Sequence, residues 1–402
     1  MIGRREMLKL TAAGGAAAFS VLGWPGAVFA AAPGERRLIV VVLRGAMDGL
    51  AAVPPLADAQ YREKRGSLAL PMPGEAGGCL TLAHGFALHP ALAPLYPYWQ
   101  KDELLFVHAS GNGYRTRSHF DAQDLMESGL SVKRGMSDGW LNRALALLQH
   151  GRDRLGLAVG GAVPLILRGK VAVASWEPPS GMRDASPEFI AALAPLYRAD
   201  PLLGPALAGG LKAQHFSESV LGDAMEGGRG FGPKTFAPLA QAAGKLLAAD
   251  DGPRIAELEM LGWDTHVNQG AAEGRLAQNF AGYAEGLAAL AAAMGDAWLK
   301  TVLVAVTEFG RTVAVNGNNG TDHGTASVLL VLGGAVKGGR IAGDWPGLSQ
   351  LQDDRDLRVA TDSRSVMKGI LRDHLGLDRG DLARKVFPDV PELKPFDGLV
   401  KV

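Results

Sequence analysis

Acidic, basic and imidazole side chains gather between Thr307 and Gly324, where the sequence reads TEFGRTVAVNGNNGTDHG. Glu308 and Arg311 lie near the start of this segment, and Asp322 and His323 lie near its end. Carboxylate oxygens and imidazole nitrogens are ligands that Zn²⁺ and similar divalent ions take in proteins. The segment therefore predicts half of a metal-dependent active site. The alternative for Glu308 is a salt bridge with Arg311, three residues further on.

Asp264 and His266, in the segment GWDTH, form a second acid and imidazole pair. Side chains two residues apart point to the same side of an extended segment, so both can bind one ion. The alternative is a turn in which Asp264 caps the following helix. Asp48, in the segment LRGAMDGL, is a further candidate ligand, and its alternative is a turn residue or a helix N-cap.

Ser118 opens a helix that is expected to end near Gly129, and Asp121 three residues on gives the form of a capping box. Ser118 either caps this helix or acts as a nucleophile where backbone N–H groups favour an anion. His119 or Asp121 facing the same pocket is a further alternative. Arg117 either holds an anionic substrate through paired donors or is a solvated loop charge.

Short apolar runs predict the buried strands that position these side chains. Strands are expected over 38–43, 104–108, 155–159, 163–168, 255–261, 301–307 and 327–332, and helices over 187–197, 238–249, 271–294 and 364–375. Open α/β sheets place their chemistry past the carboxyl ends of the strands. Because Asp48, Asp264 and Glu308 each follow such an end, they are expected to share one edge of a sheet.

Composition sets further limits on the function. The chain has 402 residues, 47% of them hydrophobic, which suffices for one large α/β domain or two smaller ones. Lys plus Arg and Asp plus Glu both number 41, so the zero net charge gives no electrostatic footprint for nucleic acid. The single cysteine, Cys79, excludes an internal disulfide and is expected to be structural.

The first residues are typical of a secretory signal. Arg4 and Arg5 precede an apolar stretch over 10–24 and a small-residue cleavage signal that ends at Ala30, which indicates the twin-arginine type. The alternative is a short amphipathic helix or membrane anchor, but a spanning helix needs about 20 apolar residues. We expect residues 1–30 to be removed by way of the twin-arginine translocation machinery. The mature protein would then be periplasmic or secreted, without a stable membrane span.

Several motifs together resemble a family of exported bacterial proteins known as domain of unknown function 1501. They are the paired arginines, LRGAMDGL, RSHFDAQDLMESG, GWDTH, TEFGRT, GTDHG and ATDSRSVMKGIL. That family is placed near the alkaline phosphatase and sulfatase superfamily. The resemblance implies an alkaline phosphatase-like three-layer α/β sandwich, with a mostly parallel central sheet and helices on both faces. Residues 31–402 would form a single domain, with a cap insertion around 170–235.

The resemblance also implies roles for individual residues. They are Asp48 as the aspartate ending the first strand, Ser118 as the nucleophile, Asp264 with His266 as one metal pair, Glu308 where an aspartate normally stands, and His323 as the late histidine ligand. The late strand of that superfamily usually ends in Asp-His, whereas this chain has Glu308-Phe309. One imidazole is therefore lost, and either Asp322 substitutes for it or the site holds one metal instead of two.

These observations predict a periplasmic metal-dependent hydrolase of an anionic phosphate or sulfate ester, acting on a small molecule or a polymer. Its divalent ion would be Zn²⁺, with Ca²⁺ or Mn²⁺ as alternatives, bound by some of Asp48, Asp264, His266, Glu308, Asp322 and His323. Ser118 or a metal-bound water would attack, and Arg117 or Arg311 would neutralise developing charge. The alternative is a non-catalytic exported binding or assembly protein that retains the fold.

Overall fold

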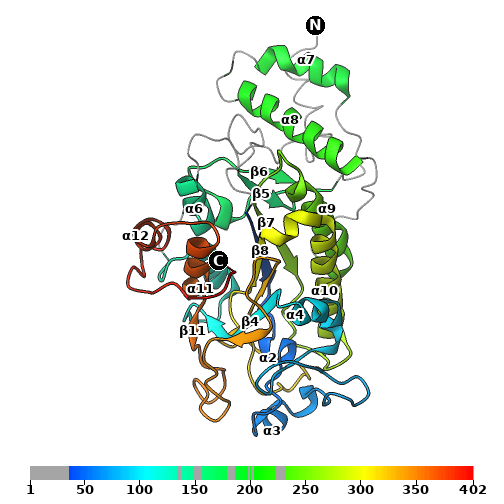
Figure 1. The fold of residues 1–402 in the computed structure, drawn as a ribbon, viewed down its shortest axis with the longest axis vertical. Helices are drawn as coiled ribbons and strands as arrows, with labels where there is room; N and C mark the ends of the chain where they lie inside the picture. Colours follow the sequence, from blue (N-terminus) through cyan, green and yellow to red (C-terminus); the bar gives the residue numbers. More distant parts are fainter. Residues whose placement is uncertain are drawn as a thin grey trace.

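A computed structural model describes residues 36–133, 137–148, 155–178, 186–197, 200, 203–222 and 232–401. Within these residues a nine-stranded sheet has the order β10-β4-β9-β8-β1-β7-β5-β6, and β11 also pairs with β4 (Figure 1). The strands are β1 (Arg37–Arg44), β4 (Leu104–Gly111), β5 (Gly156–Val159), β6 (Ala174–Trp176), β7 (Ile255–Leu261), β8 (Thr301–Val306), β9 (Ser327–Leu332), β10 (Arg340–Ala342) and β11 (Thr361–Asp362). Strands β2 (Leu80–Thr81) and β3 (Ala87–Leu88) form a separate antiparallel pair.

The direction of the strands decides where the site lies. Every pairing in the large sheet is parallel except those of β9, which runs antiparallel to both β4 and β8. Strands β4, β8, β1 and β7 therefore point the same way, and their carboxyl ends meet at one edge. Because β9 runs the other way, it starts at that same edge.

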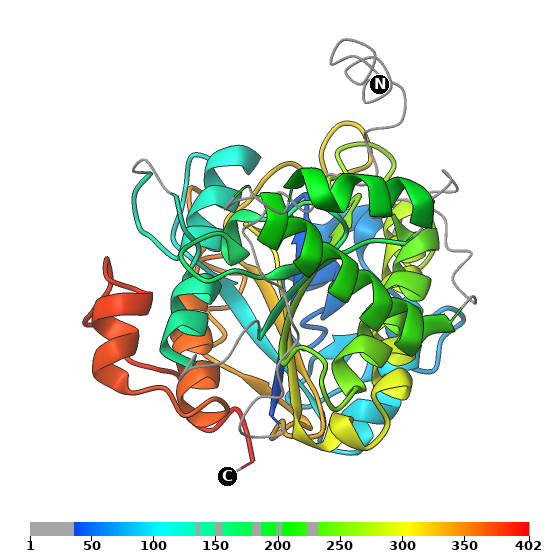
Figure 2. The same ribbon diagram turned by 90° about the horizontal axis from the view of Figure 1, so that it is seen from above.

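Helices cover both faces of the sheet, which confirms the predicted three-layer α/β class (Figure 1, Figure 2). One face packs against α4 (Tyr96–Gln100), α9 (Pro233–Ala248) and α10 (Arg275–Met294), and the other against α6 (Trp140–Leu148) and α11 (Ser363–Asp373). In β1, Ile39, Val41 and Leu43 enter the first core, and Leu38, Val40 and Val42 enter the second. A strand that is buried on both faces reads as a continuous apolar run, which is why β1 could be predicted.

The remaining helices are shorter or lie at the periphery. They are α2 (Gly49–Ala52), α3 (Tyr61–Arg65), α5 (His119–Ser128), α7 (Pro187–Tyr197), α8 (Leu203–Leu221) and α12 (Arg379–Asp381). The strand expected over 163–168 is wrong, because Leu165–Leu167 form a 3₁₀ turn in which the Leu167 N–H donates to the Pro164 carbonyl at 3.0 Å. The edge of the sheet is formed by β6 instead.

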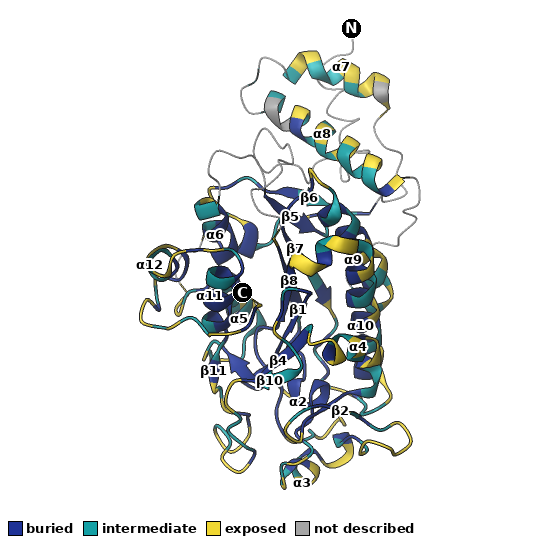
Figure 3. Ribbon diagram, viewed as in Figure 1, coloured by how far each residue is buried: buried dark blue, intermediate teal, exposed yellow. Residues whose placement is uncertain are grey.

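Helices α7 and α8 lie beyond the β5–β6 end of the sheet (Figure 1). Most of their described residues are exposed or half-buried (Figure 3), although Leu221 at the end of α8 joins the first core. The predicted cap insertion falls in this region, but 179–185, 198–199, 201–202 and 223–231 lie outside the described residues, as does the predicted signal peptide. Among the described helices, none is both long and apolar enough to cross a membrane.

Three buried histidines link the stability of the fold to pH. Nδ1 of His89 and of His108 each accepts a backbone N–H, and Nε2 of each donates to a backbone carbonyl. Only the neutral ring satisfies both contacts. His374 is likewise buried and donates from Nε2 to the Arg37 carbonyl at 2.8 Å. Burial lowers the pKa of all three to about 4.

We expect the free energy of unfolding to fall as the pH drops from about 6.5 to about 4, because only the unfolded chain then binds protons at these histidines. One pKa unit corresponds to about 1.4 kcal/mol, so each histidine contributes up to roughly 3 kcal/mol. Urea unfolding of the wild type and of His108→Gln, each at about pH 7 and about pH 5, measures the effect. The variant should lose less stability between the two pH values than the wild type, and an equal loss would contradict the assignment.

Candidate metal centre

Three histidines and one aspartate converge past the carboxyl ends of the strands. His119 opens α5 after β4, Asp264 and His266 follow β7, and His323 precedes β9. Nε2 of His323 lies 2.9 Å from Nε2 of both His119 and His266, and 3.2 Å from Oδ1 of Asp264. Nε2 of His266 lies 3.0 Å from the same aspartate oxygen, and Nε2 of His119 lies 3.5 Å from Oδ2. These four residues are called the His–Asp cluster below.

The second nitrogen of each ring in the cluster is held by an oxygen. The partners are Oε1 of Glu308 for His119 at 2.7 Å, Oδ1 of Asp322 for His266 at 3.1 Å, and the carbonyl of Arg117 for His323 at 3.0 Å. An acceptor at Nδ1 keeps a proton there and leaves a lone pair on Nε2, which is how metal-binding histidines are commonly oriented. Three lone pairs that face one another are stable only with a proton or a cation between them.

This donor set fits a divalent metal of the zinc type. Zn²⁺ takes imidazole nitrogen and carboxylate oxygen at about 2.0–2.2 Å in a tetrahedron, so ligand atoms lie roughly 3.3 Å apart. The separations of 2.9–3.5 Å between these pairs of ligand atoms lie on either side of this value, and the ligand atoms of His119, Asp264 and His323 all lie within 4.8 Å of one another. Calcium binds oxygen ligands, so three imidazoles disfavour it. The Asp264 side chain is 42% exposed, and that of His119 is 23% exposed, which leaves the centre open to a substrate.

The electrostatics of the centre favour a cation. Hydrogen bonds to Asp264 and Glu308 raise the pKa of His119 to about 9. Burial alone would raise the pKa of both carboxyl groups, but hydrogen bonds from His119 and other donors hold both below their usual range. Three carboxylates, those of Asp264, Glu308 and Asp322, contact the rings directly. A metal would displace the proton from Nε2 of His119, so its affinity is expected to decrease as the pH falls.

Glu308 is fixed as the partner of the ring on α5. Its Oε1 accepts the backbone N–H of Gly45 at 2.8 Å and Nε2 of Gln123 at 2.9 Å, and its Oε2 accepts the hydroxyl of Thr307 at 2.9 Å. Gly45 has a φ of +118°, and a Cβ added there would lie 2.7 Å from the backbone nitrogen of Asp264. Only glycine therefore lets the turn after β1 lie against the segment after β7.

The segment from Thr307 to Gly324 folds back on itself because β9 is antiparallel to β8. The Thr312 N–H donates to the Asp322 carbonyl at 2.9 Å, and Arg311 and His323 form an antiparallel bridge. The two ends of the segment, which the sequence placed in one site, thus lie side by side at the edge of the sheet.

The structure brings together some of the predicted ligands and places others further out. Asp264, His266 and His323 share the cluster. Glu308 and Asp322 contact the outer nitrogens of its rings, so each orients a ligand in this geometry.

Asp48 lies in a separate buried ion pair. Its Oδ2 is 2.6 Å from Nη2 of Arg65 and accepts Nε2 of Gln269 at 2.8 Å. Its Oδ1 caps α2 by accepting the Ala51 N–H at 3.1 Å, which is the alternative role that the sequence left open. Burial would raise the pKa of this carboxyl, but the Arg65 guanidinium holds it below its usual range.

Arg311 is buried, and its Nη1 lies 2.5 Å from Oδ1 of Asp264. The alternative in which Arg311 pairs with Glu308 is therefore wrong, because Glu308 bonds instead with His119 and Gln123.

Arg117 pairs through its guanidinium with Asp356 at 2.6 Å and with Asp353 at 3.2 Å. Its contact with the cluster is the backbone carbonyl that holds His323. Arg117 has a φ of +60°, a left-handed conformation that is uncommon for a residue other than glycine and that often marks a functional site.

Ser118 is the N-cap residue of α5, but its hydroxyl makes no capping hydrogen bond. The predicted capping box is therefore not formed. The Asp121 carboxylate bonds instead with Lys133 at 2.5 Å and with the Tyr114 hydroxyl at 3.3 Å. Ser118 directly precedes His119 in the chain, so its half-buried hydroxyl remains the candidate nucleophile.

His119 is a candidate ligand that the sequence offered only as an alternative residue facing the pocket. The feature of the sequence that indicated His119 was its position directly after Ser118, which opens the helix. Phe309, just past the end of β8, packs against the rings of His119 and His323 with centroids 4.9 and 5.2 Å apart. The third imidazole of the centre is thus supplied by α5 instead of by the end of β8.

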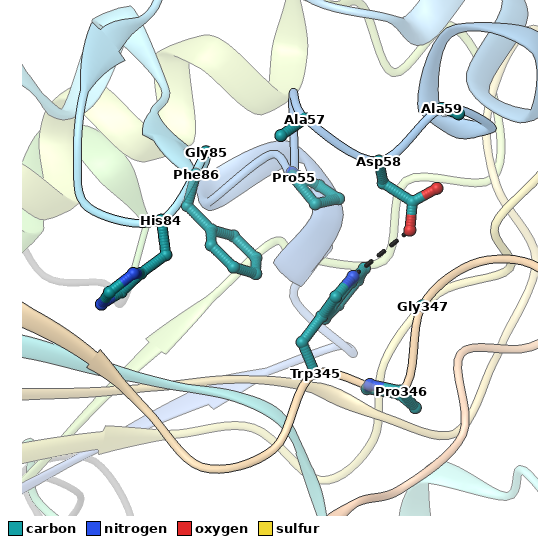
Figure 4. Close-up of a pocket in the computed structure, with 10 residues that line it drawn as sticks. All are labelled: Pro55, Ala57, Asp58, Ala59, His84, Gly85, Phe86, Trp345, Pro346 and Gly347. Carbon is teal, nitrogen blue, oxygen red and sulfur yellow. Dashed lines mark hydrogen bonds between the residues drawn. The ribbon is translucent and has the colours of Figure 1, made fainter.

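A hollow of about 460 Å³ is separate from this centre (Figure 4). Its walls include Phe86 and Trp345, and Nε1 of Trp345 donates to Oδ2 of Asp58 at 3.2 Å. No residue of the His–Asp cluster lines it. The Asp58 oxygens also accept the backbone N–H groups of Gln60 and Leu348, so this carboxylate ties two loops together.

A family described as "Protein of unknown function (DUF1501)" matches residues 117–379. The chain belongs to this family. The matched part of this DUF1501 protein contains the whole His–Asp cluster, whereas Asp48 precedes it. No curated protein matches the sequence.

Solved structures that are similar to this DUF1501 protein share little sequence with it. A phosphonate monoester hydrolase of Agrobacterium radiobacter is 13% identical with a TM-score of 0.39, covering 90% of this chain and 78% of that chain. The lipoteichoic acid synthase LtaP from Listeria monocytogenes is 11% identical with a TM-score of 0.38, covering 93% and 80%. An alkaline phosphatase from the Antarctic bacterium TAB5 is 11% identical with a TM-score of 0.37, covering 74% and 91%. Sequence identities and TM-scores this low do not identify the chemistry of the site, which is therefore inferred from the residues of this chain.

Proposed function

We propose that this DUF1501 protein is an exported, metal-dependent hydrolase of an anionic phosphate or sulfate ester. The observation that carries the proposal is the convergence of three Nε2 atoms on the Asp264 carboxylate, each ring being held from behind by an oxygen. His119, Asp264, His266 and His323 would hold the ion, and Zn²⁺ fits them best, with Mn²⁺ as the alternative. The paired arginines of the N-terminal segment support export.

A bound divalent ion would act as a Lewis acid toward an ester oxygen and lower the pKa of a nucleophile beside it. The residues of the chain prepare the site for this chemistry. Arg311 fixes the Asp264 carboxylate, and Glu308 fixes the ring of His119. Ser118 lies at the start of α5, where backbone N–H groups favour an anionic group, and its hydroxyl would attack the ester.

The proposal is tested by metal analysis of the purified protein and by turnover of aryl phosphates and aryl sulfates. We expect about one divalent ion per chain, as in other four-ligand zinc sites. Ser118→Ala should keep the metal and lose turnover by roughly a thousandfold or more, as expected when a nucleophile is removed. Thr116→Ala removes a hydroxyl from the same loop and should leave turnover unchanged.

The outcomes separate the parts of the proposal. Protein without metal would contradict the function as a whole. Turnover that survives in Ser118→Ala would exclude Ser118 as the nucleophile and favour water. A stoichiometric metal with no turnover across the panel would favour the non-catalytic binding or assembly alternative.

A further inference from the structure

A series of buried hydrogen bonds links the His–Asp cluster to the ion pair beneath it. Arg311 donates from Nη1 to Asp264 and from Nε to the Thr321 hydroxyl at 3.0 Å. The Thr321 hydroxyl donates to Oε1 of Gln269 at 2.6 Å. Nε2 of Gln269 then donates to Oδ2 of Asp48 at 2.8 Å. The series therefore begins at a cluster residue and ends at a fully buried carboxylate.

The chemistry of these groups fixes the direction of every bond in the series. A guanidinium only donates and a carboxylate only accepts. Thr321 must therefore accept from Arg311, which leaves its single proton for Gln269. Asp48 is ionised and paired with Arg65, so it takes the amide nitrogen of Gln269 and turns the amide oxygen toward Thr321. No member can reverse without breaking a bond at each neighbour.

We propose that Thr321 and Gln269 are positioning residues of the metal centre, and that they act on Asp264 through Arg311. The inference rests on the proposed function, because it requires Asp264 to bind a metal. Thr321 and Gln269 are fully buried, and Arg311 is 2% exposed. Water therefore does not compete for these hydrogen bonds, and the orientation imposed on the guanidinium is strong.

The consequence for the centre follows from what Asp264 binds. Its Oδ1 faces Nη1 of Arg311 and Nε2 of both His266 and His323. If Thr321 no longer accepts from Nε, the guanidinium keeps the bond from Nη2 to the Thr321 carbonyl but loses a buried partner, and it can tilt about the bond that remains. The carboxylate oxygen then loses its fixed place among the rings. Changes to residues that orient a ligand typically cost 10–100-fold in metal affinity.

Thr265 provides a matched control. Its hydroxyl donates to the same Oε1 of Gln269 at 2.7 Å, and it is also fully buried. Thr321→Val and Thr265→Val each replace a buried hydroxyl by a methyl group, and each removes one hydrogen bond to Oε1 of Gln269. Only Thr321 also accepts from Arg311.

The experiment compares the full chain with these two variants by chelator competition for Zn²⁺, and by the visible spectrum after Co²⁺ substitution. We expect Thr321→Val to weaken Zn²⁺ binding by about 10–100-fold and to change the Co²⁺ spectrum, and Thr265→Val to do neither. Thr321→Ser, which keeps the hydroxyl, should restore both readouts. Urea unfolding of the metal-free variants should show a loss of stability in both, and the larger loss in Thr321→Val, because only this change also leaves Nε of Arg311 without its buried acceptor.

Equal metal affinities in Thr321→Val and Thr265→Val would overturn the positioning role and leave the metal centre intact. A wild-type chain that binds neither Zn²⁺ nor Co²⁺ would instead overturn the proposed function. If the valine variants do not fold, Thr321→Ala and Thr265→Ala provide the same comparison.

Discussion

Replacement of His323 by alanine is expected to empty the metal centre and to abolish turnover. Nε2 of His323 is the atom that contacts both of the other cluster rings and Asp264, so no other side chain takes its place. The loss of metal affinity should exceed the roughly hundredfold upper range for changes to orienting residues, because a ligand itself is removed. Metal content after dialysis and turnover of the aryl ester panel measure the effect.

His215→Ala is the control for this experiment. His215 lies on α8 with a 79% exposed side chain and takes no part in the cluster. Its removal should leave both metal content and turnover unchanged. The metal-loaded wild type should also unfold at a higher temperature than the metal-free form, because an ion that binds only the folded chain stabilises it. In His323→Ala the added metal should no longer raise that temperature. A variant that retained the metal would refute the centre.

Asp48→Asn is expected to have the largest effect on stability, with no loss of metal stoichiometry at saturating metal. Asp48 and Arg65 form an ion pair whose side chains are 2% and 0% exposed. Removal of one charge leaves the other buried and unpaired, which typically costs about 3–5 kcal/mol. Urea unfolding of the metal-free protein measures this loss, and metal analysis of the loaded variant measures the stoichiometry.

Asp381→Asn is the matched control for Asp48→Asn. Asp381 pairs with Lys385 on the surface, with side chains that are 31% and 58% exposed. Solvent screens this pair, so the change should cost less than about 1 kcal/mol. If Asp48→Asn instead removed a metal equivalent and left stability nearly unchanged, Asp48 would be a ligand, as the sequence first suggested.

The sequence predicted the strands well where they are buried on both faces. β1, β8 and β9 are apolar except at their ends, and such runs have few alternatives in an α/β protein, whereas β7 also carries Glu257 and Glu259. The error at Leu165–Leu167 has a physical reason, since Pro164 precedes that run and its carbonyl closes a tight turn. An apolar run of that length does not by itself distinguish a strand from a turn that packs into the core.

The candidate site could be predicted by residue type more readily than by role. The sequence identified the carboxylates at the strand ends. Whether each one faces the ion or the Nδ1 atom of a histidine depends on the direction of its side chain. Glu308 points to Nδ1 of His119, because Gly45 and Gln123 donate to the same oxygen. Those partners come from other strands and helices, so no local pattern reveals them.

The capping-box pattern was misleading for a similar reason. The pattern pointed to Ser118 and Asp121, whereas His119, which lies between them in the sequence, contacts other residues of the cluster. Lys133, which takes the Asp121 carboxylate, lies beyond the end of α5 and is brought near only by the fold. A local motif cannot anticipate such a competing partner.

The antiparallel direction of β9 has a consequence for engineering. Neighbouring antiparallel strands can be joined by a two-residue turn. The long excursion between β8 and β9 is therefore dispensable for connecting the sheet, although it carries Glu308, Arg311, Thr321 and His323. Its sequence can be varied where side chains have room, but not at Gly310, Gly320 or Gly324, where an added Cβ would lie 1.8–2.5 Å from backbone atoms. The excursion is thus a segment in which the candidate ligand His323 and the orienting Glu308 can be changed while β8 and β9 keep their places in the sheet.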